Sequence, residues 1–242
     1  MITGHKRRNR LLGPTIFVVL VTAVFTASLL AAPRYFIARF QNRLSPHLED
    51  VDQAFVVRDG LIYRTLLQQT PSPCCSSDRH YITTERSDYL SLDWTYEITV
   101  HSQANATDEV LFVGFGQAVQ DPLFFNEPQN SVYLAISQGA SLGSDVRLSA
   151  HDVGLWSHTY LQFPGAIQDP QGGTYTVRIR KIGRSVTFEI LGTDVAASIP
   201  DILEAAPFVS QVPTRIFFGN AFGNYSFRDM RVLPERPHGR GK

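Results

Sequence analysis

The sequence of 242 residues contains only two cysteines, Cys74 and Cys75, and they are adjacent. This number excludes a disulfide-rich scaffold and a metal site built from paired CxxC motifs. Neighbouring cysteines rarely bond to each other, because the small ring strains the peptide bond between them. The pair is therefore open to several interpretations: free thiols in a loop, an intermolecular disulfide, or a vicinal redox pair in an oxidising compartment.

An excess of charge is also missing. Lys and Arg together number 22, as do Asp and Glu, so the formal net charge is zero. Nucleic-acid binding needs a clustered positive surface, and this balance argues against a nucleic-acid partner. Positive charge does gather at the two ends, in residues 1–10 and 234–242, and we interpret both segments as short solvated basic tails.

The motifs of common hydrolases and metal sites are absent as well. No Gly-x-Ser-x-Gly motif marks a serine nucleophile. No His-x-x-x-His pair or carboxylate cluster has the spacing of a metal site. The sequence therefore predicts no catalytic residue, no metal and no cofactor, and it favours a binding protein over an enzyme.

What the sequence does contain is one long apolar run. Leu11–Ala32 has no charged residue and follows a basic segment, residues 6–10. About 20 apolar residues in a helix cross the hydrocarbon core of a bilayer. The run is longer than the roughly 7–15 apolar residues of a secretory signal, and no clean Ala-x-Ala cleavage site precedes Pro33. It predicts an uncleaved, single-pass transmembrane signal anchor, with the lipid bilayer as its partner.

The basic residues on the two sides of this run predict its orientation. Those before it, in residues 6–10, are denser than those after it, Arg34, Arg39 and Arg43. Positive charge favours the cytoplasmic side of a membrane. We therefore expect a cytoplasmic N-terminus and an extracellular or periplasmic C-terminal domain.

Residues 33–50 are expected to form a juxtamembrane amphipathic helix or stalk. Phe36, Phe40 and Leu44 recur with the spacing of one helical face. This helix would either lie on the lipid headgroups, with its arginines on phosphate, or continue the anchor as a stalk. Ser45-Pro46 would end it.

From residue 51 to residue 233 the pattern becomes that of β-strands. Asp59-Gly60 between two apolar runs predicts a hairpin with a type I′ turn. Apolar and polar residues alternate through Leu90–His101, which predicts a strand with Trp94 in the core. Residues 110–116 predict a strand covered on both faces. Further strands are expected at residues 131–136, 145–150, 156–163, 174–180, 186–190, 215–219 and 225–233, with a short helical turn at 200–204. Such spacing indicates a sandwich or barrel.

The C-terminal half resembles a known family. Residues 175–190, YTVRIRKIGRSVTFEI, run from one strand through a glycine turn into the next, and residues 215–219 and 226–232, RIFFG and SFRDMRV, supply two closing strands. These segments are similar to the paired and final strands of concanavalin A-like (laminin-G-like) jelly rolls. The resemblance implies a mainly β fold, an antiparallel jelly-roll β-sandwich, here preceded by one N-terminal transmembrane helix. In many members the concave face of this fold holds carbohydrate.

The sequence departs from the hydrolytic members of that family. Those members carry a Glu-x-Asp-x-x-Glu strand that supplies two carboxylates for glycoside cleavage. Nothing here matches it: Glu85–Asp88 has the wrong spacing. Asp93 and Glu97 would lie about 13 Å apart on one strand face, at about 3.3 Å per residue. No catalytic pair is therefore expected.

Two groups of side chains could bind carbohydrate instead, because rings stack on sugar faces and polar groups bond hydroxyls. The first group is His151, Asp152, Trp156, His158 and Tyr160. The second is Asn220, Phe222, Asn224 and Tyr225. The alternative is that the large aromatics belong to the core, His158 lies on the surface, and the asparagines occupy turns.

Together these features lead to one hypothesis with two rivals. The hypothesis is a membrane-anchored extracytoplasmic module that binds carbohydrate or acts in adhesion. The first rival is a non-catalytic scaffold that contacts a protein at the membrane. The second is a glycan-processing enzyme with an unrecognised site. An open groove lined by aromatics would favour the lectin hypothesis, and a groove filled by side chains would favour the scaffold.

Overall fold

The computed structural model describes residues 34–50, 53–64, 80–103, 109–119, 128–138, 145–152, 158–167, 172–222 and 225–235. All of them belong to the compact unit Arg34–Lys242. In this part of the chain no helix is long and apolar enough to span a membrane. The predicted anchor Leu11–Ala32, the N-terminal basic tail and the adjacent pair Cys74 and Cys75 lie outside the described residues, as does the C-terminal tail from residue 236.

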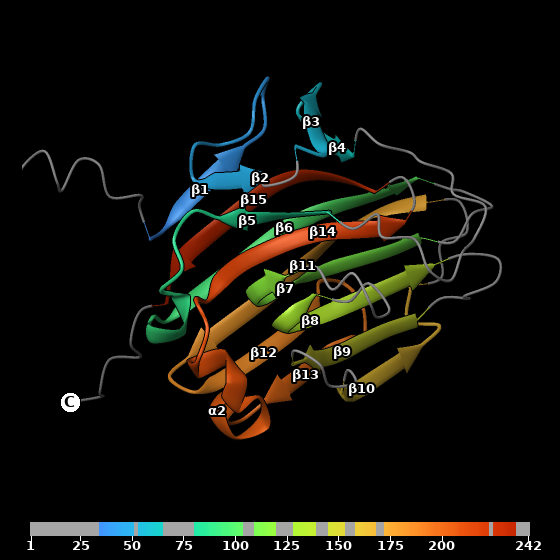
Figure 1. The fold of residues 1–242 in the computed structure, drawn as a ribbon. Coiled ribbons are helices and arrows are strands. Elements are labelled where there is room, and N and C mark those ends of the chain that lie inside the picture. The colour runs from blue at the N-terminus through green and yellow to red at the C-terminus, as the bar shows by residue number, and fades with distance from the viewer. Residues whose placement is uncertain are drawn as a thin grey trace, which may run out of the picture. The chain divides into compact units, whose positions relative to one another are not determined.

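The described residues form two antiparallel sheets that pack face to face (Figure 1). Sheet A has the strand order β13-β12-β11-β6-β15-β4-β3, and β1 also pairs with β15. In that order its strands are β13 Ala196–Ile199, β12 Ser185–Ile190, β11 Gly172–Ile182, β6 Trp94–Gln103, β15 Ser226–Pro234, β4 Leu61–Arg64 and β3 Phe55–Arg58, with β1 at Phe36–Arg39.

Sheet B has the strand order β10-β9-β8-β7-β14-β5-β2. Its strands are β10 His158–Pro164, β9 Asp145–His151, β8 Gln129–Gln138, β7 Glu109–Val119, β14 Arg215–Phe222, β5 His80–Thr84 and β2 Leu48–Asp50. Three short helical turns complete the described part: η1 Tyr89–Ser91, α2 Ile202–Ala205 and η2 Pro207–Ser210. The mainly β, antiparallel sandwich expected from the sequence is therefore confirmed.

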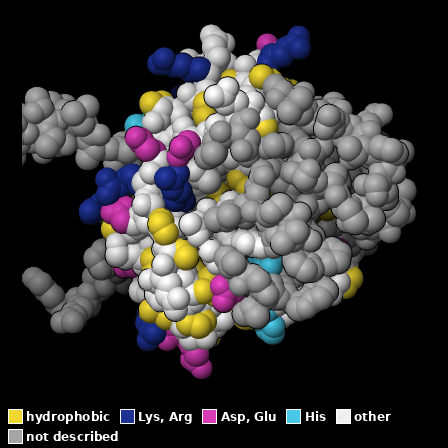
Figure 2. Space-filling view, viewed as in Figure 1, with side chains coloured by type: hydrophobic (Ala, Val, Ile, Leu, Met, Phe, Trp, Pro, Cys, Tyr) yellow, Lys and Arg dark blue, Asp and Glu magenta, His cyan; other side chains and the backbone are white. Residues whose placement is uncertain are grey.

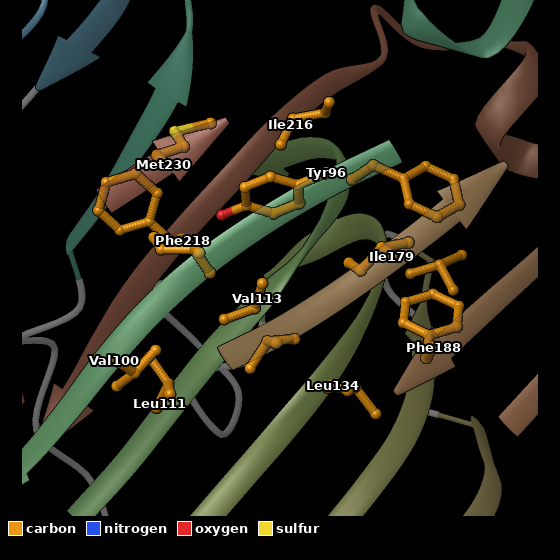
Figure 3. Close-up of a cluster of buried hydrophobic side chains, with 14 of the residues drawn as sticks. Tyr96, Val100, Leu111, Val113, Leu134, Ile179, Phe188, Ile216, Phe218 and Met230 are labelled. Atoms are coloured by element: carbon orange, nitrogen blue, oxygen red, sulfur yellow. The ribbon is translucent and has the colours of Figure 1, made fainter. Parts of the chain in front are cut away.

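The main core lies between the two sheets. Trp94 on β6, Phe115 on β7 and Phe188 on β12 are all fully buried. The Trp94 and Phe115 rings meet edge to face at 5.6 Å, and Phe115 stacks with Phe188 at 6.2 Å. Figure 3 shows side chains of both sheets pointing into this space, among them Phe188 and, from β8, Leu134. Because side chains alternate along each strand, the remaining parity of sheet B points away from this core.

The hairpin predicted at Asp59-Gly60 is confirmed as β3 and β4. Asp59 has a φ of 53° and Gly60 a φ of 78°, the two positive values that a type I′ turn requires. Trp94 is a core residue, as expected. Residues 110–116 are buried on both faces, and α2 occupies the predicted helical turn.

The predicted helix over residues 33–50 is wrong. Phe36–Arg39 is strand β1, paired with β15, and Leu48–Asp50 is strand β2. Phe36, Ala38 and Phe40 are buried at every second position, and they join the main core. The i, i+4 spacing of Phe36 and Phe40 is compatible with a strand, which repeats every two residues, as well as with a helix. These residues form a strand because they pair with the edge of β15. The domain thus begins at Arg34 rather than at residue 51.

The strand predicted from Leu90 begins later, at Trp94. Tyr89–Ser91 forms the turn η1, and the indole Nε1 of Trp94 donates to the Tyr89 carbonyl at 2.8 Å. The Lys181 ammonium donates to the Leu92 carbonyl at 2.8 Å, and burial lowers the pKa of this lysine. In a strand, these two carbonyls would accept hydrogen bonds from a neighbouring strand. Because side chains occupy them instead, the alternating residues Leu90 and Leu92 do not extend the strand.

A carboxylate clamped by two arginines lies on the exposed face of sheet A. Glu97 on β6 is nearly buried, at 6% exposure. It accepts a hydrogen bond of 2.6 Å from Arg178 on β11 and another of 2.5 Å from Arg231 on β15. The bond to Glu97 raises the pKa of the Arg178 guanidinium. The clamp links three adjacent strands of sheet A.

Replacing Glu97 with alanine should destabilise the domain. Two charged hydrogen bonds would lose their acceptor, which costs about 2 kcal/mol of unfolding free energy. Urea unfolding of the full chain in detergent micelles, followed by tryptophan fluorescence, measures this cost. The control is Asp59→Asn, which keeps a residue that tolerates the positive φ of this turn and removes only an ion pair with Arg58 that is exposed on both sides and worth less than about 0.5 kcal/mol. Equal losses in the two variants would contradict the role of the clamp.

Candidate functional site

The face of sheet B that points away from sheet A has two rows of aromatic side chains separated by glycines. Residues paired across neighbouring strands lie on the same face. In the first row Gly114 on β7 lies between Phe217 on β14 and Tyr133 on β8. In the second row Gly219 on β14 lies between Tyr81 on β5 and Phe112 on β7, as the same pairing rule requires.

The aromatics lean over these glycines and touch one another. We call Tyr81, Phe112, Tyr133 and Phe217 the outer aromatic cluster. Tyr81 meets Phe217 at 5.5 Å and Phe112 at 6.2 Å, and Phe112 meets Tyr133 at 5.5 Å, all edge to face. None is more than 4% exposed. Aromatic side chains therefore fill the centre of this face.

One end of the face is polar and buried. Register places Arg215 on β14, Gly116 on β7, Ser131 on β8 and His151 on β9 in one row. Ser131 is fully buried and His151 is 4% exposed. The row crosses three strand spacings of about 4.8 Å, so its ends lie about 14 Å apart. We call Gln117, Asn130, Ser131, His151 and Arg215 the polar end.

An irregular junction of β7 and β8 holds part of the polar end in place. The register shifts between Gly116 and Val119, and Ala118 and Asn130 have positive φ values of 53° and 51°. The Ser131 hydroxyl accepts from the Ala118 N–H at 2.8 Å and donates to a carbonyl at 3.0 Å. The Asn130 amide donates to the Gln117 side chain at 2.8 Å. Such bulges often re-aim side chains next to binding sites.

His151 carries an unsatisfied nitrogen at this end. Its Nδ1 atom is buried and has no hydrogen-bond partner among the described residues. Leaving a buried polar atom unsatisfied costs about 1–3 kcal/mol, so native structures rarely do so without a reason. A ligand hydroxyl could supply the missing bond, since the imidazole nitrogen donates or accepts according to its tautomer.

Arg215 provides a charged group at the other side of the polar end. Its guanidinium donates to Glu49 on β2 at 2.5 Å and to the Thr83 hydroxyl on β5 at 3.2 Å. The arginine side chain is 30% exposed and the glutamate 49%. These two bonds direct the guanidinium toward β5 and β2, which lie on the other side of β14 from Gly116.

Comparison with known proteins identifies the fold. No family model matches the sequence, and no curated protein matches it. Among solved structures, the carbohydrate recognition domain of Emp47p aligns with a TM-score of 0.57 and 13% identity, over 83% of this chain and 95% of that domain. A legume lectin-like domain from Entamoeba histolytica aligns at 0.54 and 10% identity, over 82% and 97%. The Ca2+-bound exoplasmic/lumenal domain of VIP36 aligns at 0.54 and 11% identity, over 85% and 92%. This chain has the concanavalin A-like lectin jelly-roll fold.

The resemblance found in the sequence is therefore confirmed at the level of fold. Identities of 10–13% carry the architecture and not the binding residues. Within the described part of this lectin fold, no group of three or more His, Cys, Asp and Glu side chains is arranged to hold a metal ion. The lining of the polar end is instead made of amide, hydroxyl, imidazole and guanidinium groups, which suit a neutral, hydroxylated ligand.

The first predicted group of binding residues is only partly assembled. Asp152 is half-buried directly after His151, at the polar end, whereas Trp156 lies outside the described residues. His158 is exposed on the edge strand β10, and its ring meets Tyr160 at 4.7 Å. The Tyr160 hydroxyl donates to the Ala205 carbonyl at 2.5 Å, and burial raises the pKa of this tyrosine. Tyr160 thus holds α2 against the sheet.

The second predicted group is not a surface cluster in the described residues. Asn220 is fully buried within β14, opposite Leu111 of the main core, and the loop position expected for it is wrong. Tyr225 is also buried, at 1% exposure. Asn224 lies outside the described residues. Strand β14 extends three residues beyond its predicted end at Gly219 and carries Asn220 into the sandwich.

Sequence reasoning missed most of the polar end. Gln117, Asn130, Ser131 and Arg215 were not singled out, because each stands at a strand end and none belongs to a chemical motif. One signal was present: Gly114 and Gly116 interrupt an otherwise apolar run at alternate positions, where a strand usually carries side chains.

Substituting Gly114 tests the packing beneath this face. A Cβ atom at that position would lie 2.3 Å from the Val132 carbonyl oxygen and 2.6 Å from the Tyr133 Cβ. Gly114→Ala should therefore lower the unfolding free energy by about 2 kcal/mol, as measured by urea unfolding of the full chain. Gly183→Asn is the control, since that turn is open and asparagine tolerates its φ of 57°. A Gly114→Ala variant as stable as wild type would show that β7 and β8 do not approach each other this closely at Gly114.

Proposed function

We propose that this chain is a membrane-anchored lectin-like module that binds carbohydrate outside the cytoplasm through the polar end of sheet B. The observation that carries the proposal is the buried Nδ1 atom of His151, which has no partner among the described residues and lies on one row with Ser131. The lectin fold supports it, since Emp47p and Emp46p domains of this fold are carbohydrate recognition domains.

The chemistry of the polar end suits sugar hydroxyls. A hydroxyl both donates and accepts, so it pairs with groups that offer both functions. Ser131, Gln117, Asn130 and His151 offer them without a formal charge that a neutral sugar would leave unpaired. Arg215 adds a donor whose orientation is already set by Glu49 and Thr83. A pre-oriented donor lowers the ordering cost of binding.

A glycan array probed with the detergent-solubilised full chain tests this proposal. His151→Ala and Asn130→Gly should each weaken binding at least about tenfold, the effect of losing about 1.4 kcal/mol. Asn130→Gly keeps the positive φ of that position and removes only the amide. His158→Ala, on the exposed edge strand, is the control and should bind like wild type. If both site variants bind glycan like wild type, the ligand site lies outside the polar end.

One observation favours the scaffold as a second candidate. The outer aromatic cluster is buried at the centre of the face on which a lectin ligand was expected, so its rings line no open groove for a sugar, and a filled groove is the outcome expected of the scaffold. A full chain that binds no glycan on the array would favour this second candidate.

The membrane part of the proposal is supported by the 22 uncharged residues of Leu11–Ala32 and the basic segment before them. An enzyme that is active only outside the cytoplasm, fused after Lys242, should be active if the orientation is as proposed. The matched control carries the same enzyme at the N-terminus and should be inactive. The opposite result would reverse the topology.

A further inference from the structure

One edge of sheet A combines exposed aliphatic side chains with arginines. We call Ile37, Arg39, Arg43, Val56 and Arg58 the basic edge. They come from β1, the loop that follows it, and β3. Strands β1 and β4 both pair with β15, and β3 pairs with β4. A Cβ atom on Gly60, in the β3–β4 turn, would lie 3.4 Å from the Phe40 carbonyl oxygen, so this turn lies beside the end of β1.

The aliphatic side chains of the basic edge face outward. Ile37 is 61% exposed and Val56 is 43% exposed. In β1 the buried residues Phe36 and Ala38 alternate with Ile37 and Arg39, so both of the latter point away from the core. Figure 2 shows Lys or Arg side chains flanking the upper tip of the molecule, with hydrophobic side chains between them. Aliphatic side chains beside arginines form a surface that suits the interface of a bilayer.

Positive charge exceeds negative charge on this edge. Arg39 and Arg43 form no ion pair with any described residue. Arg58 lies 3.5 Å from Asp59, but both side chains are at least 80% exposed, so the pair leaves the arginine available. Asp229, the residue opposite Arg39, lies 4.0 Å from Arg228, so Asp59 and Asp229 together face the four arginines Arg39, Arg43, Arg58 and Arg228. The excess positive charge complements an anionic surface.

The start of the domain is fixed next to this edge. The Tyr89 hydroxyl donates to the Arg34 carbonyl at 3.0 Å, and the Tyr35 hydroxyl donates to the Asp93 carbonyl at 3.2 Å. Burial raises the pKa of Tyr89 to about 12, so this donor stays protonated. Arg34 follows the end of the apolar run at Ala32 by two residues, which span at most about 7 Å. A bilayer crossed by that run would therefore reach the domain at β1.

We propose that the basic edge docks the domain on the anionic phospholipid headgroups of the membrane that anchors it. The inference rests on the anchorage proposed above. Arg39, Arg43 and Arg58 bind headgroup phosphates, and Ile37 and Val56 enter the interface between them. The polar end lies on sheet B, the other sheet of the sandwich (Figure 1).

Hydrogen exchange of the full chain in nanodiscs tests the docking. One set of discs contains phosphatidylcholine alone, and the other contains phosphatidylcholine with phosphatidylglycerol. Amides of residues 37–44 and 56–61 should exchange more slowly in the anionic discs. Each arginine near an anionic surface contributes about fivefold, so Arg39→Glu with Arg43→Glu should abolish the protection. Arg184→Glu, at a 60% exposed arginine in the β11–β12 turn, is the control and should keep it.

Two results would overturn the inference and can be told apart. Equal exchange in both kinds of disc, with the protein retained in them, would refute the docking and leave the anchorage intact. Release of the full chain from membranes by alkaline carbonate would refute the anchorage, and the docking with it. Neither result bears on glycan binding by the polar end, which the array measures separately.

Discussion

The packing of sheet A against sheet B is the constraint on which the rest of the structure depends. Trp94, Phe115 and Phe188 meet between the sheets and assign one parity of each strand to the core. The alternate residues of the sheet B strands then point away from sheet A and form the outer face of that sheet. Gly114 and Gly219 stand between aromatic residues of the neighbouring strands on this face, and the aromatic rings meet edge to face in the outer aromatic cluster.

The same parity rule produces the polar end. Ser131 and His151 lie two positions from Tyr133 and Ser149 on their strands, so they continue the outer face beyond the aromatics. The bulge after Gly116 stops regular pairing there and turns backbone groups toward Ser131. The buried aromatic centre and the polar end therefore lie on the same face of sheet B, and the proposed binding site is at its rim.

In the proposed arrangement, sheet A meets the membrane and sheet B carries the glycan site. Sheet A carries the basic edge and the clamp on Glu97, which ties β6, β11 and β15 together. The clamp stiffens the sheet from whose edge β1 and the β3–β4 hairpin project. In the proposed arrangement, this stiffness lets a contact made at the basic edge set the direction in which sheet B faces.

Local patterns in the sequence determined much of this protein. Alternation identified most long strands and Asp59-Gly60 identified its turn, because period two and turn chemistry depend only on neighbouring residues. The lectin fold was expected from the resemblance of residues 175–190, 215–219 and 226–232 to known jelly rolls. Tertiary structure alone decided the rest. Residues 36–39 became a strand because β15 offered them an edge, and Trp94 rather than Leu90 began β6 because side chains bonded the carbonyls before it. The polar end gathers residues from β7, β8, β9 and β14, up to 98 positions apart between Gln117 and Arg215. Register across strands brings such residues together, and no local pattern encodes it.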